Sequence, residues 1–128
     1  MKARPVMFVA VLFALAVSLA PLGSAEAFHL HHRMSVDAFE WGFSAREITI
    51  PAGAWVQLTL NNTGQFPHDI TFEAPGTWGA SERITSGRST AMDLYVTQPG
   101  TYIFYCSVPG TTRTHREQGM EGRLVVTP

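Results

Sequence analysis

The chain has 128 residues, a formal net charge of −1 at pH 7 and a single cysteine. This length suits one domain, and the near-neutral balance without a basic stripe argues against nucleic acid as a partner. A lone cysteine also excludes a framework of intramolecular disulfides.

The first predicted element is a secretory signal peptide over residues 1–27. Lys2 and Arg4 precede an almost unbroken apolar run from residue 6 to residue 20, and residues 25–27 (Ala-Glu-Ala) have the small-x-small pattern of a cleavage site. An uncleaved membrane anchor is the alternative, although the run is shorter than the ~20 residues that a spanning helix needs. We therefore expect an exported protein, periplasmic or extracellular, cleaved after Ala27 or, as a second choice, after Ala25.

The next residues, 28–34, are rich in histidine and are expected to form a flexible segment ahead of the domain. His29, His31 and His32 are candidates for a surface metal site, since His-rich tracts bind metal. Such a tract is more often simply solvated. The folded domain is expected over residues 35–128.

Short runs of β-branched and aromatic residues, separated by turn residues, make up the rest of the chain. No window has the long period of a helix. This pattern predicts a single all-β domain, an antiparallel Greek-key β-sandwich. The predicted strands cover residues 35–39, 47–50, 56–60, 69–73, 91–96, 101–106 and 123–126.

Four side chains near the ends of these strands are candidate metal ligands. His68 precedes the strand at 69–73, Cys106 ends the strand at 101–106, and His115 and Met120 follow in the next loop. Loops at strand ends are held by a rigid scaffold, so they are suitable places for a site. One thiolate, two imidazoles and a thioether are the ligand set of a type 1, or blue, copper centre.

Each of these residues alone has a plainer explanation. A buried cysteine usually packs as a small hydrophobic residue, a lone histidine is more often structural, and a methionine fills gaps in a core. An exported free thiol needs protection from oxidation, which burial or a metal would provide. Zinc also binds Cys and His, but structural zinc sites use more cysteines in paired spacings, so copper is favoured.

Taken together, these motifs resemble those of the cupredoxins, the family of small blue copper proteins. The similarity extends over the whole predicted domain and rests on four segments: residues 48–62, 68–69, 99–110 and 115–122. The resemblance implies one copper ion with His68, Cys106 and His115 as equatorial ligands and Met120 as the axial ligand.

The resemblance also implies a function. We expect a one-electron carrier that alternates between Cu(II) and Cu(I), is not an enzyme, and docks transiently as a monomer on a redox protein such as a cytochrome or a membrane electron-transfer complex. His115 would form the edge through which electrons pass, and Arg113 and Arg116 would steer acidic partners toward it. The expected apolar patch around that edge consists of Pro67, Val108, Pro109 and Met120.

Two features depart from the family's pattern. In many relatives the histidine follows the Pro-Gly pair at once, whereas residues 111–114 intervene here. Even doubling a loop costs only about 0.6 kcal/mol, so His115 stays the expected ligand. Asp69 stands where some relatives have Asn. We expect it to tie the loop of His68 to the loop of Cys106 by hydrogen bonds, with an ordinary strand-entry aspartate as the alternative.

Three other functions remain open. A copper trafficking or resistance protein would use the same ligands without electron transfer. A metal-free adhesion or assembly module would treat the order of the four side chains as accidental. An enzyme with a Cys–His nucleophile would also need an oxyanion hole and a substrate cleft, and nothing beyond the two residues signals them.

Overall fold

Alternation of apolar and polar residues builds the long strands of this protein. The computed structural model describes residues 31–76 and 79–128. In β4 (Trp55–Asn62) every second side chain is buried, and β8 (Glu121–Thr127) follows the same alternation. Because successive side chains of a strand point to opposite faces, each of these strands presents one apolar face to the interior.

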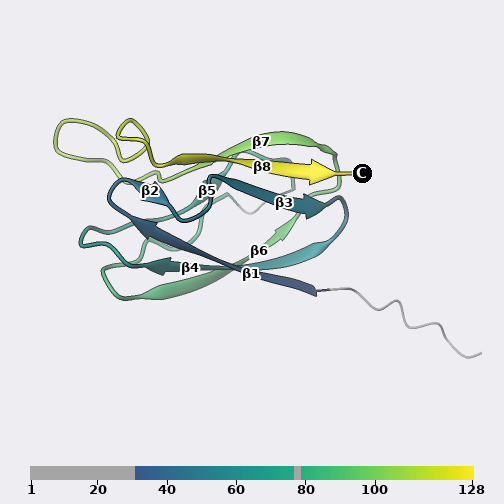
Figure 1. Cartoon of the computed structure of the whole chain (residues 1–128), viewed down its shortest axis with the longest axis horizontal. Coiled ribbons are helices and arrows are strands. Elements are labelled where there is room, and N and C mark those ends of the chain that lie inside the picture. The colour runs from purple at the N-terminus through teal and green to yellow at the C-terminus, as the bar shows by residue number, and fades with distance from the viewer. Residues whose placement is uncertain (1–30, 77–78) are drawn as a thin grey trace, which may run out of the picture.

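Two four-stranded sheets enclose that interior (Figure 1). The first sheet has the order β2-β1-β4-β6 and adds β2 (Gly42–Phe43), β1 (His31–Phe39) and β6 (Ser89–Tyr95) to β4. The second has the order β3-β8-β7-β5 and adds β3 (Glu47–Pro51), β7 (Gly100–Tyr105) and β5 (Thr71–Phe72) to β8. The predicted all-β sandwich is confirmed. Within the described ranges, no helix is long and apolar enough to span a membrane.

The strand directions differ from the predicted antiparallel arrangement, because each sheet contains one parallel pair. β1 runs parallel to β4, and β3 runs parallel to β8. Figure 1 shows why: the chain runs one way in β1, returns in β3 of the other sheet, and runs the first way again in β4. Alternation of side chains reports which face is buried but not which way a strand runs. The pattern therefore predicted the sandwich without its parallel pairs.

Most strand boundaries differ by one or two residues from the predicted ones, β2 was not predicted, and β1 and β5 show the differences that matter here. β1 begins at His31 rather than residue 35, because its backbone pairs with β4 from Trp55 onward. Residues 31–34 thus belong to a strand and not to a flexible segment. β5 is only two residues long, and isolated bridges join His68 before it to Ile84 and Thr71 within it to Ala80. The predicted signal peptide and His29 lie outside the described residues, so the surface metal site remains a prediction.

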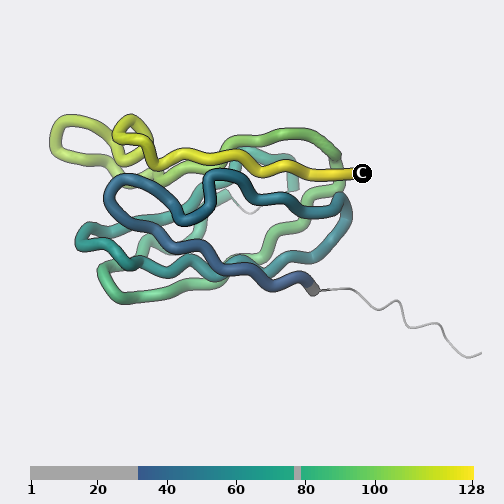
Figure 2. The backbone as a smooth tube through the Cα atoms, in the orientation of Figure 1, coloured from purple at the N-terminus to yellow at the C-terminus, as the bar shows by residue number. Residues whose placement is uncertain are grey.

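One hydrophobic core fills the space between the two sheets, and aromatic rings pack against one another within it. Phe104 on β7 is fully buried, and its ring centroid lies 5.4 Å from that of Phe43 and 5.5 Å from that of Phe72. The loops that follow β1, β4 and β7 gather at one end of the sandwich, on the left in Figures 1 and 2. The start of β1 and the end of β8 lie at the opposite end.

Candidate metal centre

Three of the four predicted ligands meet at the loop end of the sandwich. The Nδ1 atoms of His68 and His115 are 3.2 Å apart, and the Sγ atom of Cys106 lies 3.9 Å from the first and 3.5 Å from the second. All three side chains are buried. Within the described ranges they form a group whose donor atoms all lie within 4.8 Å of one another.

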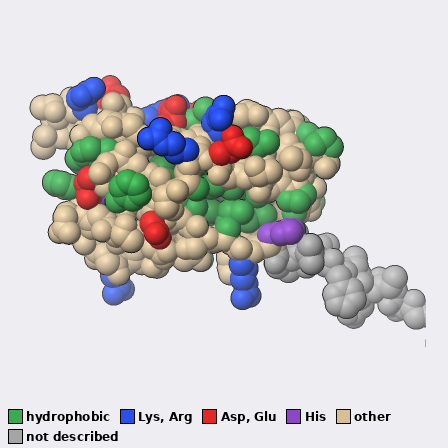
Figure 3. Space-filling model, viewed as in Figure 1, with side chains coloured by type: hydrophobic (Ala, Val, Ile, Leu, Met, Phe, Trp, Pro, Cys, Tyr) green, Lys and Arg blue, Asp and Glu red, His purple; other side chains and the backbone are tan. Residues whose placement is uncertain are grey.

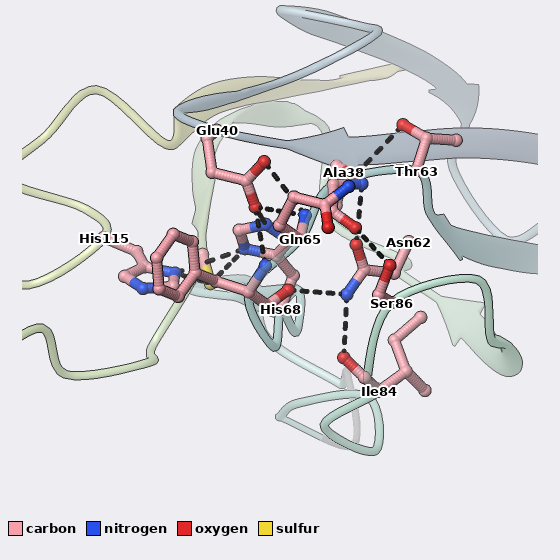
Figure 4. A network of polar contacts seen from close by, with 12 residues as sticks. Ala38, Glu40, Asn62, Thr63, Gln65, His68, Ile84, Ser86 and His115 are labelled. Atoms are coloured by element: carbon pink, nitrogen blue, oxygen red, sulfur yellow. Dashed lines mark hydrogen bonds and ion pairs between the residues drawn. The ribbon is translucent and has the colours of Figure 1, made fainter.

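Asn62, the last residue of β4, fixes the loop that carries His68. The amide nitrogen of its side chain donates to the carbonyl oxygens of Phe66 (2.8 Å) and Ile84 (2.9 Å), and its oxygen accepts from the Gly64 N–H at 2.9 Å (Figure 4). The backbones of His68 and Ile84 also exchange two hydrogen bonds. A buried amide with all these bonds made holds the loop in one conformation.

Asp69 links the loop of His68 to the loop of Cys106. Its carboxylate accepts the backbone N–H of Ser107 at 2.6 Å and the Ser107 hydroxyl at 2.8 Å. The guanidinium of Arg83 lies 3.3 Å from the same carboxylate. The loops that carry the first imidazole and the thiolate are therefore joined through one buried side chain.

Backbone hydrogen bonds set the positions of the remaining donors. The Cys106 N–H donates to the carbonyl of Met120 at 3.1 Å, and the Met120 N–H donates to the carbonyl of His115 at 3.1 Å. Met120 is fully buried. The His115 N–H bonds to the carbonyl of Val108 at 3.0 Å, so the loop of residues 109–114 projects outward between two fixed points.

Burial of this group changes the acidity of two of its members. Desolvation raises the pKa of the Cys106 thiol to about 11. Desolvation and the neighbouring His68 lower the pKa of His115 below its ordinary value of 6.5. A neutral imidazole is the form that binds a metal, whereas the thiol must lose its proton to do so.

Trp41 covers the histidine that was expected to reach the surface. His115 is only 3% exposed, and the Trp41 ring contacts it edge-on with 4.7 Å between centroids. Trp41 also stacks on Phe66, with 5.6 Å between ring centroids, and Phe66 is 53% exposed. The exposed edge that the family resemblance implied for His115 is therefore replaced by an aromatic pair.

A cavity of about 460 Å³ opens beside this pair. Its walls include Trp41, Phe66, Pro109, Arg113 and His115, so one side is aromatic and the other belongs to the loop of residues 109–114. Figure 3 shows hydrophobic side chains reaching the surface at the same end of the molecule as the ligand loops, on the left.

The expected docking surface needs three corrections. Val108 is buried, with only 7% of its surface exposed. Met120 is fully buried, so it is not part of any surface. Arg116 is engaged by Glu73 at 2.8 Å and Glu121 at 2.6 Å. Arg113 is exposed and takes part in no ion pair within the described residues.

Glu40 is one of the residues at this site that sequence reasoning did not single out. Its carboxylate lies 2.8 Å from Nε2 of His68, on the side of the ring away from Cys106 (Figure 4). Glu40 and His68 are 28 positions apart. Glu40 lies in the short connection between β1 and β2, and no motif or spacing points to it.

The chemistry of the three donors determines which metal they can hold. Two imidazoles and one thiolate suit copper. All three side chains are buried, and backbone hydrogen bonds join the buried Met120 to Cys106 and His115. A hard oxygen-seeking cation has no carboxylate in this group, because the described cluster contains only two histidines and the cysteine. The residues present therefore fit copper.

Comparisons with known proteins agree with this donor set. A family model described as the cupredoxin-like domain matches residues 5–126. Plastocyanin from Prochlorothrix hollandica is 30% identical, with 95% of this chain and 90% of that protein covered. A copper-containing nitrite reductase from Alcaligenes faecalis is 34% identical over 80 residues, but the chain spans only 21% of its length. Among solved structures, reduced auracyanin from Roseiflexus castenholzii has a TM-score of 0.64 and 22% identity, with 75% of this chain and 97% of that chain covered.

Proposed function

Since this chain belongs to the cupredoxin family, we propose that it carries single electrons between redox proteins and that His68, Cys106, His115 and Met120 hold its copper. The observation that carries the proposal is the buried group of one thiol and two imidazoles at the loop end of the sandwich. Copper bound by such ligands alternates between Cu(II) and Cu(I) and so stores one electron.

The surroundings of the donors suit this task, because a carrier works best when its ligands move little between oxidation states. Asn62 fixes the loop of His68, and Asp69 joins that loop to the one after Cys106. These polar groups are buried and hydrogen-bonded, so rearranging them would leave donors or acceptors unpaired at a cost of about 1–3 kcal/mol each. The protein thereby holds the ligand atoms in place before the metal arrives.

The proposed docking surface for a redox partner is the aromatic pair of Trp41 and Phe66 together with the nearby cavity. Trp41 contacts His115 directly and Phe66 is exposed, so the two rings lead from a buried ligand to the solvent. Aromatic side chains are enriched at contacts between proteins, so this pair suits a docking surface. The partner is a redox protein, and the carrier is proposed to act as a monomer.

The proposal is tested by adding copper(II) to the protein of residues 28–128 and recording its visible spectrum. We expect an intense blue band from thiolate-to-copper charge transfer, which disappears in Cys106→Ser, and reversible reduction by one electron. A colourless loaded protein would refute the carrier function. If the protein is blue but surrenders its copper to a chelator faster than it exchanges electrons, the trafficking alternative is correct instead.

Export is proposed from the sequence pattern of residues 1–27 and agrees with the family's small carriers. Mass spectrometry of the protein recovered from the producing cells tests it. A mature chain that starts at Phe28, or at Glu26, is the expected result. An intact chain retained in the membrane would favour the uncleaved anchor.

A further inference from the structure

We propose that Glu40 is a positioning residue that orients His68 toward the metal and lowers the reduction potential of the bound copper. The inference rests on the proposed function, since it assigns a role to a residue behind one of the proposed ligands. It is carried by the contact between Glu40 Oε1 and His68 Nε2, which measures 2.8 Å.

The geometry places Glu40 behind the ligand and not beside the metal. Nδ1 of His68 faces Cys106 and His115, whereas Nε2 faces Glu40. An ionised carboxylate only accepts hydrogen bonds, so the ring donates an N–H from Nε2 and keeps a lone pair on Nδ1. Glu40 is absent from the group of converging donor atoms in the described residues. It therefore acts through His68.

The carboxylate is itself held firmly. It accepts the Gln65 N–H at 2.9 and 3.1 Å and the Phe66 N–H at 2.9 Å. Hydrogen bonds from these two backbone N–H groups favour the ionised form of the carboxylate. The group is charged at neutral pH, and its side chain is 23% exposed.

Gly64 provides an independent sign that this contact shapes the loop. A Cβ atom at Gly64 would overlap both carboxylate oxygens of Glu40, so only glycine leaves room for the carboxylate. Gly64 also donates its N–H to Asn62 at 2.9 Å. The loop that carries His68 is thus built around the Glu40 carboxylate.

The electrostatic consequence follows from the sign of the charge. A carboxylate on the remote nitrogen makes the imidazole a stronger donor and adds negative charge near the metal. Cu(II) gains more from this than Cu(I), because it carries one more positive charge. The reduction potential should therefore be lower with Glu40 than without it.

Two substitutions separate charge from orientation. Glu40→Gln keeps an oxygen that can accept from Nε2 but removes the charge, so we expect the potential to rise. A tenfold change in the Cu(II)/Cu(I) affinity ratio corresponds to a rise of 59 mV for a one-electron couple. Glu40→Ala removes the acceptor as well, and we expect Cu(II) affinity, measured by chelator competition, to fall 10–100-fold.

Two further variants complete the experiment. Gly64→Ala displaces the carboxylate without removing it and should raise the potential in the same direction; it decides the question if either Glu40 variant fails to fold. Asp93→Asn removes an exposed carboxylate on β6 and is the matched charge control, for which no change is expected. Thermal melts of the metal-free proteins show whether each variant is folded.

The two possible failures are distinguishable. If the wild-type protein gives no blue band, the proposed function fails. If the wild-type protein is blue and redox-active but Glu40→Gln and Gly64→Ala have its potential, and Glu40→Ala has its affinity, the role of Glu40 is refuted while the carrier function stands.

Discussion

The pKa of Cys106 determines how many protons are released when copper binds. Its thiol has a pKa of about 11, so it is protonated at pH 7.5 in the metal-free protein. His115 has a lowered pKa and is neutral at that pH, so it has no proton to release. A metal ligand must be deprotonated. We therefore expect each copper ion to displace about one proton at pH 7.5.

The measurement is a titration with copper(II) in weakly buffered solution with a pH indicator. Cys106→Ser, which lacks the thiol, should release no proton on the same addition. Uptake of copper by the wild-type protein without proton release would mean that the thiol is already ionised in the folded state, contrary to the effect of its burial.

The proposed ligand side chains could be singled out from the sequence because each belongs to a local motif. Cys106 directly follows β7, and His115 and Met120 come after it within one loop. Glu40 and Trp41 could not be recognised in this way, because they act on histidines far away in the sequence. Such contacts depend on how the two sheets pack, and this packing produces no recognisable residue spacing in the sequence.

At the scale of elements, the inserted loop ends in a small capping motif. The Thr114 N–H and hydroxyl donate to the carboxylate of Glu117 at 2.7 and 3.0 Å, and the Glu117 N–H donates back to the Thr114 hydroxyl at 3.2 Å. This reciprocal arrangement is the capping box of helix starts, used here for one turn. It holds the chain on both sides of His115.

Loss of this motif should loosen the turn that carries His115. We expect Thr114→Ala to lower the free energy of unfolding by about 1 kcal/mol, as for other capping residues, and to weaken copper binding. Thr112→Ala, at an exposed position of the same loop, is the matched control and should change neither. Denaturant unfolding of the metal-free protein and chelator competition provide the two measurements; equal results for both variants would contradict a role for the cap.

The same loop shows how far the sequence predicts an element. The length of the insertion and its position after the Pro-Gly pair are plain in the chain, and so is the Thr-x-x-Glu spacing. The path of the loop is not plain from the sequence. It depends on a close approach between Gly110 and the carbonyl of Arg113, which leaves no room for a Cβ atom. The strands behave similarly: alternation identified β4 and β8, while the two-residue β2 and the parallel pairs depend on contacts between sheets.

At the scale of the whole molecule, the position of unpaired charge should decide which partners approach the copper end. Arg116 is neutralised by two carboxylates and stacks over the Tyr105 ring at 4.1 Å, whereas Arg113 lines the cavity next to His115. An unpaired cation attracts anions toward its surroundings. Of the two arginines, Arg113 should therefore do most of the steering.

This is tested with small oxidants of opposite charge acting on the reduced protein. At low ionic strength, Arg113→Gln should slow oxidation by hexacyanoferrate(III) several-fold and should not slow oxidation by tris(phenanthroline)cobalt(III). Arg116→Gln should have a smaller effect on the anionic reagent. Added salt should remove these differences. Equal rates for wild-type protein and Arg113→Gln with the anionic reagent would exclude steering by this residue.

The opposite placement of the ligand loops and of the two ends of the described domain has a practical consequence. Both the start of β1 and the end of β8 lie at the end of the sandwich remote from the loop between β7 and β8 (Figure 1). A linker joined at either position would hold the protein to an electrode or a fusion partner by its far end. The aromatic pair would then face the solution, free to meet a mobile partner, while the length of the sandwich would insulate the copper from the support.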